Sequence, residues 1–182
     1  MENKENKPLA NLYGYIFKDE KNTQEMDTLD FLADSTFFKK LSRRQLKKVL
    51  QKLHIRTFRE DEFLFEFGNP GAALFLIEEG EVSIEIPDKL DGSTRVVTTI
   101  GSNTFLGEIA LLNNDERTAS ARALKTTRTL ALYRNDLVGM TKTDPEIASV
   151  IYQSLAQVLG KRLMTTTKMI NEQKKEQAKN AA

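Results

Sequence analysis

The spacing of apolar residues changes twice along the chain and divides it into three regions. Between residues 28 and 54, apolar side chains recur every three or four positions, as in amphipathic helices, and Ser42 stands where an N-cap is expected. From residue 55 to residue 133 the period falls to two, which is typical of strands with one buried face. Helical spacing returns after residue 135 and continues to about residue 170.

The middle region has the punctuation of an antiparallel sheet. Turn residues such as Asp91-Gly92 separate short apolar runs at intervals of about eight to twelve residues. The seven expected strands are 55–58, 63–67, 73–78, 82–86, 95–100, 118–124 and 127–133. We therefore predict a mainly β protein with flanking helices, in the α+β class: an eight-stranded jelly-roll β-barrel with N-terminal helices and a long C-terminal helix.

The predicted domain covers residues 28–170, between a flexible N-terminal segment, residues 1–27, and a charged tail, residues 171–182. The apolar patch Leu12–Phe17 in the N-terminal segment is expected to dock on a neighbouring surface. The last helix is expected to open at Asp144-Pro145 and to run for about 25 to 30 residues. Such a helix can pack back on the barrel or pair with a second copy, so a homodimer through it is an open alternative. Within the domain, the N-terminal helices, the barrel and the C-terminal helices are assigned to residues 28–54, 55–133 and 135–170.

Charge and cysteine content exclude several classes of function. The 27 basic and 26 acidic side chains leave a net charge of +1, so no global field recruits nucleic acid or an anionic membrane. The chain has no cysteine, which excludes disulfides, thiolate metal sites and a cysteine nucleophile. Aromatic residues are not interleaved among Arg43, Arg44, Lys47 and Lys48, so these side chains are interpreted as a solvated helix face.

The sequence also shows no sign of targeting, metal binding or catalysis. The first residues are polar, and no run of about 18 apolar residues occurs, so we expect a soluble cytoplasmic protein. His54 is the one histidine, near the end of a predicted helix, and a structural role is expected for it. Because neither a nucleophile–base pair nor a P-loop occurs, we expect no enzyme, no metal and no cofactor.

Residues 105–119 carry the candidate chemistry. Gly107 permits a close backbone approach, and the apolar turn Ile109–Leu112 can begin a helix whose free amides point at an anion. Arg117 can fold back over the same place and present its forked donors to two phosphate oxygens. Glu108 would repel phosphate alone, but it can accept hydrogen bonds from the hydroxyls of a sugar. The set suggests a sugar phosphate as ligand; the alternative is a loop arginine in a weak surface ion pair.

Two motifs resemble those of a known family. The first is the run Leu106-Gly107-Glu108-Ile109-Ala110-Leu111, a five-residue spacer, and Arg117-Thr118-Ala119. The second is the glycine turn, apolar strand and further glycine of residues 67–80. Both are similar to motifs of the cyclic nucleotide-binding domain family, shared by bacterial catabolite activators, regulatory subunits of cyclic-nucleotide-dependent kinases and cyclic-nucleotide-gated channels. The resemblance covers about residues 30–165, and the first motif matches the family's phosphate-binding cassette.

The resemblance implies cAMP or cGMP as the ligand. It implies that Arg117 holds the cyclic phosphate, that Glu108 holds the ribose 2′-hydroxyl, and that the Thr118 hydroxyl and the amides from Glu108 to Ala110 hold the remaining oxygens. A threonine at position 118 also occurs in members that bind cyclic GMP. The long helix would cap the base through Thr166 and Thr167, which follow Arg162-Leu163. The complete set of expected ligand-binding residues is Leu106, Gly107, Glu108, Ile109, Ala110, Arg117, Thr118, Ala119, Thr166 and Thr167.

The expected function is that of a stand-alone cyclic nucleotide sensor, bacterial in type. Too few residues follow the base-capping region for the helix-turn-helix of the catabolite activators, so nucleic acid is not an expected partner. Ligand binding would move the C-terminal helix and signal to an effector protein that the sequence does not name. The alternative is a ligand-independent interaction or scaffold module that uses the same barrel and helix.

Overall fold

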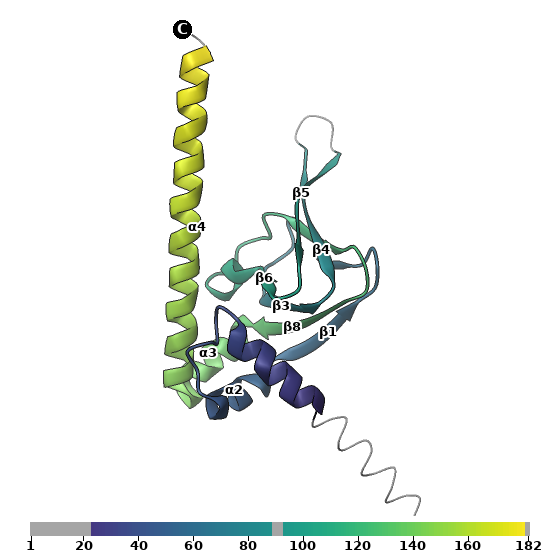
Figure 1. Ribbon diagram of the computed structural model, residues 1–182, viewed down its shortest axis with the longest axis vertical. Helices are drawn as coiled ribbons and strands as arrows, with labels where there is room; N and C mark the ends of the chain where they lie inside the picture. Colours follow the sequence, from purple (N-terminus) through teal and green to yellow (C-terminus); the bar gives the residue numbers. More distant parts are fainter. Residues whose placement is uncertain (1–22, 89–92, 181–182) are drawn as a thin grey trace, which may run out of the picture.

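A computed structural model describes residues 23–88 and 93–180 of the chain (Figure 1). Eight strands form two four-stranded antiparallel sheets, with the orders β1-β8-β3-β6 and β2-β7-β4-β5. The jelly-roll prediction is confirmed, except that no hydrogen-bonded strand pair in the described residues joins the sheets and closes the barrel. The strands are β1 His54–Phe58, β2 Phe63–Phe65, β3 Ala73–Glu79, β4 Glu81–Pro87, β5 Thr94–Gly101, β6 Thr104–Leu106, β7 Ser120–Ala123 and β8 Thr127–Tyr133.

The strand predictions differ from the structure where the candidate chemistry lies. The prediction for β8 is confirmed at both ends, whereas β6 was missed because three residues are too few to show a period. The strand predicted from residue 118 starts at Ser120, because Thr118 and Ala119 form a bend. The predicted turn at Asp91-Gly92 and the patch Leu12–Phe17 lie outside the described residues.

In the part of the chain that the structure describes, two helices precede the sheets. Residues 23–34 are helical, whereas residues 23–27 were predicted to belong to the flexible N-terminal segment. Helix α2 spans Arg43–Leu50 and begins with the capping box that satisfies two free amides at a helix start. The Ser42 hydroxyl accepts from the Gln45 amide, and the Gln45 side chain accepts from the Ser42 amide, which confirms the predicted N-cap.

Two helices follow the sheets: α3, Arg134–Thr143, and α4, Pro145–Asn180. Helix α4 is 36 residues long, so it exceeds the predicted length and continues through most of the expected charged tail. Residues after 170 are rich in Glu, Lys, Gln and Ala, which all favour helix. Figure 1 shows α4 standing alongside the sheets and projecting past them.

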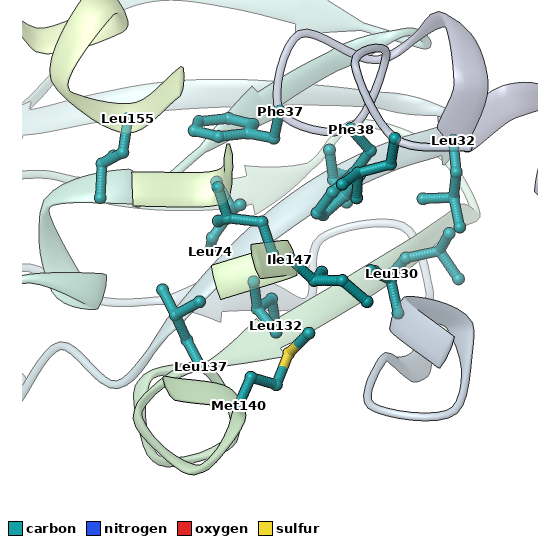
Figure 2. Packing of buried hydrophobic residues seen from close by; sticks show 14 of the residues in the cluster. Leu32, Phe37, Phe38, Leu74, Leu130, Leu132, Leu137, Met140, Ile147 and Leu155 are labelled. Atoms are coloured by element: carbon teal, nitrogen blue, oxygen red, sulfur yellow. The ribbon is translucent and has the colours of Figure 1, made fainter. Parts of the chain in front are cut away.

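The main apolar core lies between the helices and one face of the sheet that contains β3 and β8. Figure 2 shows Phe37, Phe38 and Ile147 packed over Leu130 and Leu132 of β8. Alternation along β8 turns Ala131 to the opposite face, where it joins a smaller cluster between the two sheets. Since the first turns of α4 belong to the main core, the start of this helix is held firmly against the sheet that also positions the candidate site.

Candidate functional site

A cavity of about 350 Å³ opens between the two sheets, beside α4. Eight of the ten expected ligand-binding residues line it: Leu106, Gly107, Glu108, Ile109, Ala110, Arg117, Thr118 and Ala119. The structure therefore brings the two halves of the predicted cassette together around one space. The other residues that line it are Phe65, Gly71, Ile84, Thr98, Ile100, Phe105, Asn113, Asp115, Glu116 and Arg162.

Gly107 lets the chain turn sharply between β6 and the site. Its φ of 76° lies in the left-handed region, and a Cβ here would come within 2.5 Å of Arg117 Nη1 and 3.0 Å of the Ala73 carbonyl oxygen. The following residues, Glu108–Leu111, form a single 3₁₀ turn, η1, and not the start of a longer helix. Within it the Ala110 amide donates to the Gly107 carbonyl at 3.2 Å, so that amide is already satisfied.

Arg117 lines the cavity and is buried, with 8% of its surface exposed. Its Nη2 donates to the Ala73 carbonyl at 2.9 Å and its Nη1 to the Gly107 carbonyl at 3.3 Å, while its guanidinium carbon lies 4.0 Å from the centre of the Phe65 ring. Within the described residues, its Nε has no acceptor and no carboxylate lies within 4.0 Å of the group.

Burial lowers the pKa of Arg117, the nearby Glu108 carboxylate opposes that shift, and the charge of Arg134 adds to it. An arginine remains protonated in proteins even so. The cavity thus contains a buried positive charge that no carboxylate of the described residues contacts directly, which is a costly arrangement that a bound anion would relieve.

Glu108 is also buried, and its partner comes from α4. Its Oε1 accepts a hydrogen bond from Arg162 Nη1, an ion pair in which the Glu108 side chain is 2% exposed and the Arg162 side chain 53%. The guanidinium carbon of Arg162 lies 5.4 Å from the centre of the Phe105 ring, at the cavity wall. One side chain of α4 therefore reaches the site directly.

Arg162 was not among the site residues predicted from the sequence, although the Arg162-Leu163 pair was noted there as preceding Thr166 and Thr167. The available signal was its place one helical turn before Thr166. Thr166 and Thr167 lie on an exposed stretch of α4 and are not among the residues that line the cavity. Thr118 and Ile109 are exposed at its edge.

The apolar wall of the cavity was also missed. It comes from separate strands: Phe65 from β2, Ile84 from β4, Ile100 from β5 and Phe105 from β6. Each side chain taken alone looks like ordinary core in the sequence. Only strand pairing shows that they share one face.

Arg134 and Gly71 hold the cassette against the rest of the fold. Arg134, the first residue of α3, donates through Nη1 to the carbonyls of Gly71 at 3.1 Å and Ala110 at 2.9 Å, and also to that of Asn113. A Cβ on Gly71 would meet the Ala110 Cβ at 2.9 Å, so the second motif of the sequence abuts the first. The glycine turn is therefore part of the architecture of the site.

Among the described residues, no group of three or more His, Cys, Asp or Glu side chains is placed to hold a metal ion. In the same part of the chain, none of the helices combines the length and apolarity that crossing a membrane requires.

Comparisons with known proteins agree with this geometry. Residues 55–144 match the family model of the cyclic nucleotide-binding domain. Over 132 residues, 72% of this chain, it is 33% identical to a candidate potassium channel protein of Rhodopseudomonas palustris and 30% identical to the cyclic AMP receptor protein of Thermus thermophilus. The chain spans 31% and 59% of the length of these two relatives.

A solved structure extends the likeness to three dimensions. The crystal structure of the Thermus thermophilus catabolite activator protein superposes with a TM-score of 0.67 at 28% identity, over 75% of this chain and 62% of that one. The residues that the family model matches, 55–144, include the whole cassette from Leu106 to Ala119 and all strand residues of both sheets except His54. This chain therefore belongs to the cyclic nucleotide-binding domain family.

Proposed function

We propose that this chain is a cyclic nucleotide sensor that binds cAMP or cGMP in the cavity and regulates a partner without catalysing a reaction. The observation that carries the proposal is Arg117, a buried guanidinium with no carboxylate partner in the described residues. A cyclic phosphodiester carries one negative charge and would supply the missing counter-ion. Forked hydrogen bonds from the remaining Arg117 donors to two phosphate oxygens would add directed attraction.

The rest of the cavity suits a nucleoside. Glu108 would accept from the ribose 2′-hydroxyl, which explains why a carboxylate lines an anion site. The Thr118 hydroxyl and the amides of Glu108 and Ile109 would meet the remaining phosphate oxygens. The apolar wall formed by Ile84, Ile100 and Phe105 offers a surface for the flat base.

Signalling would pass through α4. Arg162 donates a hydrogen bond to Glu108 in this structure, so the ribose hydroxyl and Arg162 would compete for one carboxylate. Binding would then shift α4 toward a second position, in which Thr166 and Thr167 could reach the base. The ligand can shift the populations of the two α4 positions only as far as it binds one position more tightly than the other.

A second copy of the chain is the proposed neighbour of the outer half of α4. Beyond Val158 the helix leaves the core, and its apolar side chains Leu163, Met164, Met169 and Ile170 are 46–75% exposed. Such a stripe is typical of a helix that pairs with another helix, so we expect a homodimer through α4.

Titration calorimetry with cAMP and cGMP tests the proposal. We expect binding of at least one of them, and Arg117→Ala should weaken it by about 100-fold, because hydrogen bonds to a charged group are each worth about 1.5–3 kcal/mol. Arg59→Ala, an exposed arginine at the β1–β2 turn, is the matched control. Absence of binding near millimolar nucleotide, or equal affinity in Arg117→Ala, would refute the function.

A further inference from the structure

The near-neutral net charge of the chain conceals a sharp separation of charge along it. Residues 35–59 contain nine lysines and arginines and no acidic residue, whereas residues 60–88 contain nine acidic residues and no basic one. An arrangement of this kind gives local fields that the net charge of +1 does not reveal. The basic segment, residues 35–59, contributes no residue to the cavity, so nucleotide binding does not explain its charge.

The basic segment gathers on one side of α2. Helical spacing turns Leu46 and Val49 into the core and turns the basic residues outward. Lys40, Arg43, Arg44, Lys47 and Lys48 form this outward surface, and all five are exposed; we name it the α2 basic face. Figure 1 places α2 at the lower end of the molecule, away from the β4–β5 hairpin.

The partners of these residues leave the middle of the face open. Arg43 pairs with Asp30 at 2.5 Å, Lys48 pairs with Asp144 at 2.5 Å, and Lys40 donates to the neutral side chain of Gln153 at 3.4 Å. Within the described residues, Arg44 and Lys47 have no carboxylate within 4.0 Å. The centre of the face therefore presents free cations between two occupied ones.

The surroundings of the face decide which anion fits it. The neighbouring helix, residues 23–34, carries four acidic side chains and no basic one, and Asp30 and Asp144 lie at the edges of the face. A continuous anionic surface, such as a membrane or a nucleic acid backbone, would meet these carboxylates as well as the cations. Aromatic side chains that could stack on bases do not occur in α2. Discrete carboxylates can avoid the acidic edges and pair with Arg44 and Lys47.

We infer that the α2 basic face is a docking surface for an acidic segment of a partner protein. Charge complementarity of this kind chiefly sets specificity and the rate of encounter. Two cations of the face already pair with carboxylates of the same chain, Asp30 and Asp144. A carboxylate of the partner would form the same kind of ion pair with Arg44 or Lys47.

The face is also connected to the nucleotide site. Leu46 and Val49 lie in the same apolar cluster as Ile147 and Ile151 of α4, and Lys48 is paired at the residue just before that helix starts. This step rests on the proposed function: if the movement of α4 on nucleotide binding reaches the packed start of the helix, it changes the α2 basic face. Thermodynamic reciprocity then requires the acidic partner to change nucleotide affinity by the same factor.

Fluorescence anisotropy with a labelled Glu-Ala repeat peptide tests the docking surface, with the corresponding Gln-Ala peptide as the neutral probe. The double variant Arg44→Gln/Lys47→Gln should bind the acidic peptide about tenfold more weakly, and the difference should shrink between about 0.05 M and about 0.2 M salt. The matched control Lys174→Gln/Lys175→Gln removes equal charge from an exposed part of α4 and should keep the affinity of the original chain.

Equal losses in the two double variants, or no loss in either, would overturn the inference, because the peptide would then sense total charge only. Tighter binding to anionic phospholipid vesicles or to duplex DNA than to the peptide would overturn it in favour of another class of partner. Calorimetry of Arg44→Gln/Lys47→Gln with cAMP separates the two proposals: unchanged nucleotide affinity with lost peptide binding supports the docking surface independently of the nucleotide site.

Discussion

The two faces of the sheet that contains β3 and β8 are built for different purposes. The face toward the helices is filled with large side chains, among them Phe37, Phe38 and Leu132, all fully buried. The face toward the other sheet carries Ala73 and Ala131 beside larger side chains such as Phe75 and Ile77, and it borders the open cavity at Leu106. The large side chains on the filled face stabilise the fold, whereas the open face borders a space that can take a ligand beside a buried charge.

The largest effect is expected on the filled face. Leu132→Ala should lower the free energy of unfolding by about 3 to 5 kcal/mol, because a fully buried leucine leaves a cavity that its neighbours fill only in part. Urea denaturation measures it. Val138→Ala, at a position 47% exposed on α3, is the control and should change stability by less than about 0.5 kcal/mol. Similar losses of unfolding free energy in the two variants would contradict the claim that the filled face stabilises the fold.

On the open face, Arg117 should contribute strongly to nucleotide affinity and only weakly to the free energy of unfolding. Arg117→Met removes a buried cation without a carboxylate partner but also its hydrogen bonds to the Ala73 and Gly107 carbonyls, so the unfolding free energy of the ligand-free protein should change by about 1 to 2 kcal/mol, less than for Leu132→Ala. Nucleotide affinity should fall by about 100-fold in the same variant. A loss of stability as large as that of Leu132→Ala would show that Arg117 is structural, and that the open face resembles the filled one.

Between the two faces lies the contact of α4 with the cavity. Arg162→Ala should raise cyclic nucleotide affinity by about two- to fivefold, because Glu108 would no longer have to release Arg162 to accept the ribose hydroxyl. Calorimetry measures the change, and Lys161→Ala, the exposed neighbour, serves as the control. Weaker binding in Arg162→Ala would mean that Arg162 contacts the ligand and does not compete with it.

The smallest effect is expected where α2 meets the start of α4. The hydrogen bond from Lys48 lowers the pKa of Asp144 below its usual value of 3.8, with further contributions from Thr143 and the charge of Lys52. A lowered folded-state pKa stabilises the fold above the unfolded value of about 4, and this contribution is lost as the pH falls through the folded-state pKa.

Urea midpoints measured between about pH 6 and about pH 3 should therefore fall more steeply for the original chain than for Asp144→Asn. Lys48→Gln should behave like Asp144→Asn, since it removes the same hydrogen bond. Identical slopes in all three proteins would show that the pair makes no net contribution.

Local chemistry explains which predictions from the sequence succeeded. The cassette from Leu106 to Ala119 is nearly continuous in sequence, and the requirement for glycine at position 107 is a backbone property, so eight expected residues do line one cavity. The Ser42 cap was also predictable, because a capping box is complete within four residues. What failed was either too short to show a period, as in β6, or placed by distant contacts, as in the apolar wall.

By itself, the sequence determined the alternation that makes two sheets, the helical stripes on either side of them and the residue types of an anion cassette, because each is a periodic or local pattern. Tertiary structure alone decided that Arg162, 54 residues beyond Glu108, becomes its ion-pair partner, and that Arg117 is left buried with no carboxylate beside it in the described chain. The physical reason is that charge compensation depends on distance in space, which strand pairing and helix packing create and sequence spacing does not show.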